Sequence, residues 1–294
     1  RHLIQALSHF ANSHDPLAVK LLITIPMLHD HDADTALQQL CQHLWDHDLL
    51  SPHDQINVAI RMAATSIRRG ALDAMSQWLE EVEARIDEHT PAIQKARFAI
   101  TKMRLLTATD RLNEVKEVYA AAINEPNLPT IYQYMLTRNR ARIARGQEYL
   151  DWLGRADQIL GENWGVQKVE VCFYQGSVLV ESGQAEQGRR FLEPAEFHAL
   201  RCGHSLALSE IRMSLASLDA LESQWASARA RMNKVYQTAA TRSSVPFHIR
   251  VCLYSCAIAL MENKTEDFQR WHEKMRQFME QLEPSPANAE ALAF

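Results

Sequence analysis

The stretch that decides the fold is residues 176–195, GSVLVESGQAEQGRRFLEPA. Its apolar residues recur at helical spacing on both sides of Gly183, and no run alternates as a strand would. Gly183 follows a helical run, where a left-handed residue commonly ends a helix. The small residues Gly176 and Gly188 would let the two flanking segments cross at short distance. The stretch therefore predicts a helical hairpin.

The same kind of tight turn recurs along the chain at nearly constant spacing, with steps of 36–40 residues. A unit that recurs at such a period indicates a helical solenoid, in which neighbouring hairpins bury the apolar face that each leaves open. We place these turns at Asp30, Gly70, Asp110, Gly146, Gly183, Ser223 and Asn263.

Almost every segment between these turns has the periodicity of an amphipathic helix. Two of the expected helices start at a proline that follows a capping residue, in Ser51–Pro52 and Thr90–Pro91. The expected helices span residues 2–13, 16–28, 33–46, 52–69, 71–88, 91–108, 110–123, 129–145, 147–160, 166–182, 184–202, 205–222, 224–241, 246–262 and 265–281.

Composition narrows the class of protein. The 294 residues are 47% hydrophobic and 23% charged, which excludes disorder for most of the chain. Only nine residues are glycine, so the composition argues against glycine-rich phosphate-binding loops. The net charge of −5 argues against a dedicated nucleic-acid coat. We expect one repeat domain over residues 1–282 and a flexible tail over residues 283–294.

The termini and cysteines suggest where the protein resides. The chain opens without an initiator methionine, so we read it as a fragment or a processed product. No apolar run approaches the length of a membrane span, and no leader peptide is visible. Five scattered cysteines, an odd number, favour reduced, buried thiols over a disulfide framework. We therefore expect a cytoplasmic protein with no membrane contact.

The hairpin residues resemble tetratricopeptide (TPR-like) repeats. In that family a small residue lies midway along the first helix, and a small, an apolar and a second small residue follow in the second helix. The resemblance implies an all-α, right-handed α-solenoid of about seven hairpins. Armadillo or HEAT repeats are the structural alternative, because the units here exceed about 34 residues. Three hairpins carry the pattern, with Gly176, Gly188, Leu192 and Ala195, then Ala216, Ala228, Met232 and Val235, then Cys256, Phe268, His272 and Met275.

A weaker, compositional resemblance concerns the Ala/Leu-rich helices that end in glycine, such as residues 197–203. They are similar to helical repeats of bacterial regulators, including large ATP-dependent transcription activators and response regulators. This resemblance implies a non-catalytic interaction or sensor module of a larger signalling or transcription regulator. Such a module would bind a peptide, protein segment or small signal and needs no cofactor.

In tetratricopeptide-like solenoids the first helix of each pair lines the concave groove. Here the first helices at 91–108 and 129–145 carry arginine or lysine and no acid. Arginine forks pair well with carboxylates, so we expect a protein or peptide partner with acidic residues. Its apolar side chains would lie near the two aromatic residues of the groove. The expected partner-binding residues are Asn57, Arg61, Arg68, Arg97, Thr101, Arg104, Gln133, Arg140, Phe173 and Tyr174.

Three other interpretations remain open at this stage. The arginines could be ordinary solvated residues that offset the acidic helix 71–88. The basic first helices could bind nucleic acid, in which case affinity would fall steeply with salt. The His/Asp clusters at 29–34 and 43–54 could belong to a metal-dependent hydrolase, because imidazole and carboxylate are reasonable metal ligands.

Geometry weighs against the metal enzyme. The two His/Asp clusters lie at opposite ends of helix 33–46, about 20 Å apart, too far to share one ion. Solvated turns and helix caps explain these residues more simply. His248, Cys252 and Cys256 fall on one helix face at the spacing of buried core positions. No hydrolase, phosphate-loop or zinc-protease motif occurs, so we expect no enzyme and no metal.

Overall fold

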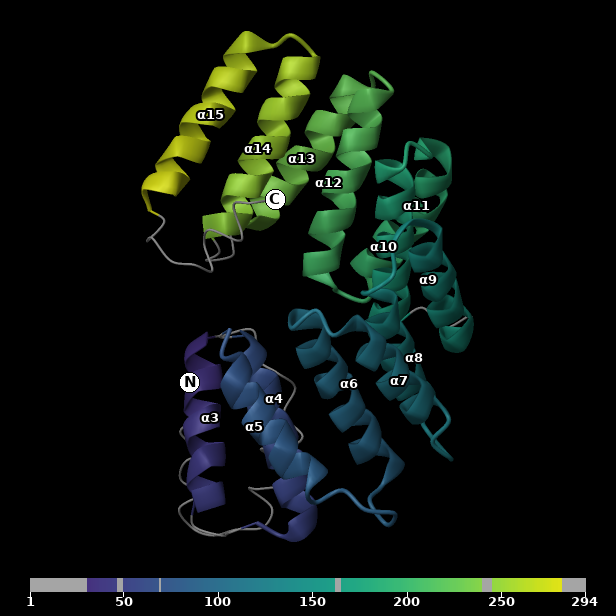
Figure 1. The fold of residues 1–294 in the computed structure, drawn as a ribbon. Coiled ribbons are helices and arrows are strands. Elements are labelled where there is room, and N and C mark those ends of the chain that lie inside the picture. Colours follow the sequence, from purple (N-terminus) through teal and green to yellow (C-terminus); the bar gives the residue numbers. More distant parts are fainter. Residues whose placement is uncertain (1–30, 47–49, 69, 162–164, 240–244, 282–294) are drawn as a thin grey trace. The chain divides into compact units, whose positions relative to one another are not determined.

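The computed structural model describes residues 31–46, 50–68, 70–161, 165–239 and 245–281 (Figure 1). All regular secondary structure in these ranges is helical. The chain divides into two compact units, residues 1–159 and 160–294, and each is treated by itself below. The helices are α3 (His31–Asp46), α4 (Pro52–Arg68), α5 (Leu72–Glu83), α6 (Ala92–Ala108), α7 (Leu112–Ile123), α8 (Thr130–Ala141), α9 (Gly146–Leu160), α10 (Val166–Glu181), α11 (Ala185–Arg201), α12 (Ser205–Leu221), α13 (Trp225–Ala239), α14 (Val245–Met261) and α15 (Thr265–Glu280).

The predicted turns close the hairpins. Six of the seven turn residues lie in the described ranges, and each has a positive φ, between 51° and 82°. The seventh, Asp30, lies outside the described residues. These turns join α4 to α5, α6 to α7, α8 to α9, α10 to α11, α12 to α13 and α14 to α15. The spacing argument therefore located these hairpin turns correctly, and three of their left-handed residues, Asp110, Ser223 and Asn263, are not glycine.

Paired hydrogen bonds explain why non-glycine residues are tolerated there. At the α12 end, the Ser223 N–H donates to Ala220 O at 3.0 Å, and the Gln224 N–H donates to Asp219 O at 2.7 Å. These two hydrogen bonds satisfy carbonyl groups that the end of a helix otherwise leaves without a donor. The same pattern closes α6 and α14, where the left-handed residues are Asp110 and Asn263.

In unit 1 the first helices α4, α6 and α8 contact one another in sequence, and the second helices α5 and α7 pack beside them. One apolar cluster joins Met103 of α6, Val115 of α7 and Leu136 of α8, and all three side chains are fully buried. The cluster therefore spans one hairpin and the first helix of the next, which is how stacked repeats share a core.

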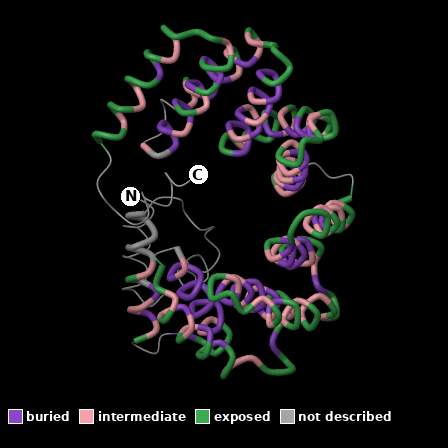
Figure 2. Tube along the Cα trace, turned by 45° about the horizontal axis from the view of Figure 1, so that its top comes forward, coloured by how far each residue is buried: buried purple, intermediate pink, exposed green. Residues whose placement is uncertain are grey.

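Unit 2 repeats this arrangement with α10, α12 and α14 as its first helices. Ile211 and Leu215 of α12 pack with α10 and α11, while Met213 and Ala216 of the same helix pack with α13 and α14. Thus α12 belongs to two core clusters. In Figure 2 buried positions lie where neighbouring helices of a unit face each other.

The repeat pattern holds closely in two hairpins. A Cβ built on Gly176 would come within 2.6 Å of Leu192 Cγ, and one on Gly188 within 2.8 Å of the Gly176 carbonyl oxygen. Small residues are therefore required at this helix crossing. In the next hairpin Ala216, Ala228, Met232 and Val235 are all buried.

The third hairpin corrects the sequence analysis. His272, placed at the apolar position of the second helix, is exposed. Its neighbour Trp271 is buried instead and packs with Cys252 and Cys256. Phe268 and Met275, the other two second-helix positions of the pattern, still pack against this cluster, so only the His272 position departs from it.

Candidate functional site

The first-helix face of unit 1 is the candidate site, since most of the predicted binding residues come from α4, α6 and α8. Two of them meet directly across α4 and α6. The Arg97 Nη1 donates to Asn57 Oδ1 at 2.9 Å. Asn57 is buried, and its Nδ2 donates to His53 O at 3.2 Å, so the side chain is held from both ends. Gln94 Nε2 also donates to His53 O, at 3.0 Å.

Arg97 is a half-buried cation with a neutral hydrogen-bond partner. Burial lowers the pKa of its guanidinium, although the nearby Tyr132 acts in the opposite direction. Among the described residues, no carboxylate lies within ion-pair distance of Arg97. A partly desolvated charge without an opposite charge is costly, and an anion placed beside it would be stabilised.

Arg140 of α8 is nearly buried and is held by α9. Its Nη2 donates to Glu148 Oε1 at 2.9 Å, and its guanidinium lies 4.7 Å from the Trp152 ring centroid. Hydrogen bonds from Arg140 and from Trp152 lower the pKa of the Glu148 carboxyl. The Nη1 of Arg140 is buried and has no hydrogen-bond partner in the described part of the chain. This nitrogen is therefore unsatisfied by the described residues, and its burial keeps it from the surface.

The remaining predicted residues of unit 1 differ in their burial and in the hydrogen bonds that they make within the fold. Thr101 is buried, and its hydroxyl donates to Arg97 O at 2.8 Å within the same helix. Gln133 Nε2 likewise donates to Leu128 O at 2.8 Å. Arg61 is buried, and Arg104 is half-buried on α6. Arg68 ends α4, and its side chain lies outside the described residues.

The predicted aromatic pair lies in unit 2, on α10. The Phe173 and Tyr174 rings are 5.3 Å apart between centroids. Phe173 packs against the core cluster that contains Val169 and Leu192, so part of its ring already contributes to the repeat core. Tyr174 is half-buried.

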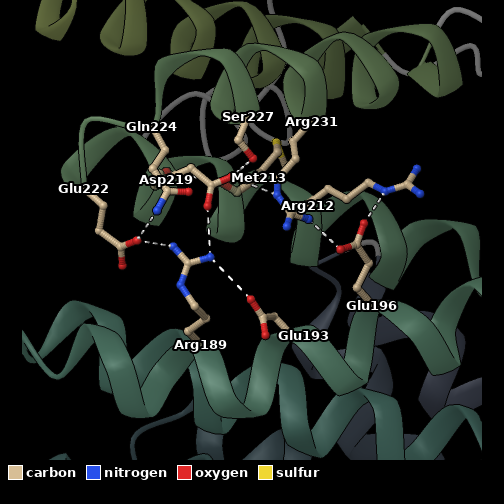
Figure 3. Close-up of polar contacts among 11 residues, drawn as sticks. Arg189, Glu193, Glu196, Arg212, Met213, Asp219, Glu222, Gln224, Ser227 and Arg231 are labelled. Atoms are coloured by element: carbon tan, nitrogen blue, oxygen red, sulfur yellow. Dashed lines mark hydrogen bonds and ion pairs between the residues drawn. The ribbon is translucent and has the colours of Figure 1, made fainter.

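Unit 2 also contains an ion-pair network that sequence reasoning missed (Figure 3). Asp219 of α12 is buried and accepts hydrogen bonds from Arg189 of α11 at 2.9 Å and from Arg231 of α13 at 3.0 Å. Ser227 donates to the same carboxylate at 2.6 Å. Burial raises the pKa of Asp219, but these three hydrogen bonds outweigh it and hold the pKa below its ordinary value.

The network continues through Glu196, which pairs with both Arg212 and Arg231. Several arginines of unit 2 are therefore matched by carboxylates of the same unit. No local motif signals this, because the partners Arg189 and Asp219 are 30 residues apart. The contrast with Arg97 makes the unit 1 face the better candidate for an external anion.

The histidine, cysteine and acidic residues of the metal-enzyme alternative form no candidate site in the described part of the chain, where no group of three such side chains could hold an ion. Ser51 instead caps α4, since its Oγ accepts the backbone N–H of Asp54 at 3.2 Å and donates to the Asp54 carboxylate at 2.6 Å. Residues 29 and 30 and residues 47–49 lie outside the described ranges. His248, Cys252 and Cys256 are buried, and burial raises the pKa of the Cys252 thiol to about 11.

No described helix combines the length and apolar character needed to cross a membrane.

No protein-family model and no curated protein matches the chain. Among solved structures, it is similar to a Signal Transduction ATPase with Numerous Domains from Pyrococcus horikoshii that carries a tetratricopeptide repeat sensor. The TM-score is 0.66 at 7% identity, over 85% of this chain and 40% of that one. The fold is a tetratricopeptide-like helical repeat. The predicted all-α repeat fold is thereby confirmed, with helical hairpins as its units.

Two further solved structures share this repeat fold. The quorum sensor NprR from B. thuringiensis, in its apo form, matches with a TM-score of 0.62 at 10% identity, over 96% of this chain and 78% of that one. A Rap protein complexed with competence and sporulation factor matches with a TM-score of 0.54 at 12% identity, over 94% and 78%. At sequence identities this low, the similarity to these structures shows a shared tetratricopeptide-like fold and no more.

Proposed function

We propose that this chain is a non-catalytic interaction module of a larger bacterial signalling or transcription regulator. It binds a peptide or protein segment with acidic residues on the first-helix face of unit 1. The observation that carries this proposal is Arg97, a half-buried guanidinium with a neutral partner and no carboxylate in ion-pair distance among the described residues. Structural neighbours named as a sensor, a quorum sensor and a factor-bound Rap protein support a regulatory role.

The face suits recognition better than chemistry. It combines arginines on α6 and α8 with threonine and amide side chains whose hydrogen bonds are used within the fold. Guanidinium forks recognise carboxylates with defined geometry. A bound segment would contact neighbouring first helices at once, so binding would alter how the hairpins of unit 1 stack and thereby signal to a linked domain.

A peptide-binding assay tests the proposal. The probe is a fluorescein-labelled peptide of alternating glutamate and leucine, and a lysine–leucine peptide of equal length is its control. We expect the acidic peptide alone to bind, and the double variant Arg97→Glu, Arg104→Glu to lose binding while its circular dichroism spectrum at the assay temperature stays that of the folded helical protein. Arg201→Glu, at an exposed position of unit 2, is the matched charge-reversal control and should bind normally.

Two results would contradict this function. Equal binding of both peptides would remove the acidic specificity. Steeply salt-dependent binding of an RNA duplex, abolished by the same double variant, would favour a nucleic-acid-binding repeat instead.

A further inference from the structure

The last described hairpin of unit 2, formed by α14 and α15, leaves large apolar side chains exposed to solvent (Figure 1). Leu253 and Leu260 of α14 are 46% and 57% exposed, and Met279 of α15 is 49% exposed. The two leucines are seven residues apart, so they lie two turns from each other on one face of α14. We call these three side chains the end face.

The equivalent positions of the preceding hairpins are covered by the next first helix. The two leucines correspond to Met213 and Ala220 of α12, 40 residues earlier, which are buried in a cluster shared with α14. One repeat before that, Phe173 and Val180 of α10 pack against a cluster that contains α12. The methionine of α15 corresponds to Ala199 of α11, which is fully buried in this cluster. The end face is therefore the side on which the next first helix would stack.

The sequence beyond α15 continues the period. First helices of unit 2 begin at Ser205 and Val245, so the next is expected to begin 40 residues later, at residue 285. Residues 285–294, SPANAEALAF, lie outside the described ranges. Their Pro286 falls 40 residues after Pro246, which lies in the first turn of α14, where proline is favoured. This periodicity favours a first helix over the flexible tail expected for residues 283–294.

The residue types of this segment suit the end face. Ala287 and Ala291 fall 40 residues after Phe247 and Val251, the buried α14 side chains that pack with α12. Small apolar side chains at these places leave room for a larger surface beneath them. The end face presents such a surface, because a leucine and a methionine stand there where the earlier hairpins have alanine. The summed side-chain volume of the contact is thereby kept similar.

Charge complementarity points to the same segment. Arg250 of α14 reaches back to Glu210 of α12, and its Nη2 donates to Oε2 at 2.6 Å. The Arg250 side chain is 33% exposed, and a guanidinium has five N–H groups. Glu290 falls 40 residues after Arg250, at the same place in the repeat. A first helix at 285–294 would bring this carboxylate to the exposed side of the guanidinium.

We propose that residues 285–294 bind the end face as the next first helix of unit 2, with Glu290 paired to Arg250. A helix of ten residues is marginal in water by itself, so its helicity depends on burying apolar surface against the end face. The segment would add one member to the row formed by α10, α12 and α14. This inference is independent of peptide binding by unit 1.

Hydrogen exchange of the full chain tests the proposal with two identical substitutions in the segment. Ala291→Asp places a charge at the position equivalent to Val251, which is fully buried. It should raise the exchange rates of α14 amides by about tenfold and lower the melting temperature, because a desolvated charge opposes docking. Ala293→Asp is the matched control, since its counterpart Leu253 is exposed, and it should change neither quantity.

A double-mutant cycle tests the contact from the other side. Leu253→Ser should destabilise the full chain, because the segment covers this side chain when it is docked. The same substitution should have no effect on a chain truncated after Pro284, where solvent already surrounds Leu253. Glu290→Lys should raise α14 exchange as Ala291→Asp does, by a smaller factor, because it places two cations together.

Three results would overturn the proposal. Equal α14 exchange in Ala291→Asp, Ala293→Asp and the wild type would show that the segment leaves the end face uncovered. An equal effect of Leu253→Ser in the full and truncated chains would show the same. If protection of α14 rises with protein concentration and sedimentation shows a dimer, the occupant is a second copy of the chain instead. Loss of protection in Ala291→Asp alone, at every concentration, supports the segment.

Discussion

The crossing of α10 and α11 gives the sharpest stability prediction. Replacing Gly188 by alanine adds a methyl group that would lie 2.6 Å from Val180 Cγ2 and 2.8 Å from the Gly176 carbonyl oxygen. Because backbone atoms and a β-branched side chain can move little, overpacking should lower the free energy of unfolding by about 3 kcal/mol. Alanine in a helix recovers about 1 kcal/mol relative to glycine. We expect a net loss of about 2 kcal/mol.

Gly154→Ala is the matched control, since Gly154 lies within α9 and its Cβ would meet nothing within 4 Å. This variant should gain about 1 kcal/mol from helix propensity alone. Urea denaturation followed by circular dichroism measures both changes. Hydrogen exchange should show the loss in α10 and α11 for Gly188→Ala. A Gly188→Ala protein as stable as the wild type would refute the close-packing argument.

Three further predictions concern unit 2 and the cysteines. Asp219→Asn should cost about 3 kcal/mol, because it leaves two arginines short of a buried partner. Because the fold holds the pKa of Asp219 below its ordinary value, the ionised carboxylate adds to the free energy of unfolding at neutral pH, and this stabilisation is lost as the pH falls through the pKa of the folded state. Urea denaturation at neutral and at acid pH should show this loss in the wild type and not in the variant. Iodoacetamide at neutral pH should label the exposed Cys202 first, and peptide mass spectrometry showing equal labelling of Cys252, whose pKa is about 11, would contradict the burial argument. Trp271→Ala should cost about 3–5 kcal/mol and His272→Ala less than about 0.5 kcal/mol by the same denaturation assay, and the reverse order would place His272 in the core, as the sequence pattern expects.

The sequence predicts the repeat architecture well because it depends on local signals. A left-handed turn residue requires only a helix end, so Asp110, Ser223 and Asn263 could be found by spacing alone. Side-chain partners are harder to foresee. The Asn57–Arg97 bond follows the period of 40 residues and could have been found by aligning equivalent positions. The Asp219 network joins three helices at unrelated spacings and leaves no such signal.

The burial of Trp271 in place of His272 shows a second limit. A pattern of small and apolar positions assigns places by residue type, whereas packing depends on volume. The indole ring of Trp271 can reach the Cys252–Cys256 side of α14 from a neighbouring position, and His272 then faces solvent. Large side chains late in a repeat array are therefore where a spacing rule is weakest.

The double membership of α12 has a mechanical consequence for unit 2. Opposite sides of α12 belong to different core clusters, so a truncation on either side of this helix disrupts one of the two clusters. Fragments that end on either side of α12 should be insoluble or unfold, and a small tilt of this helix must be felt by α10 and α14 together. Movement of α12 would therefore strain the packing on both sides of it at once.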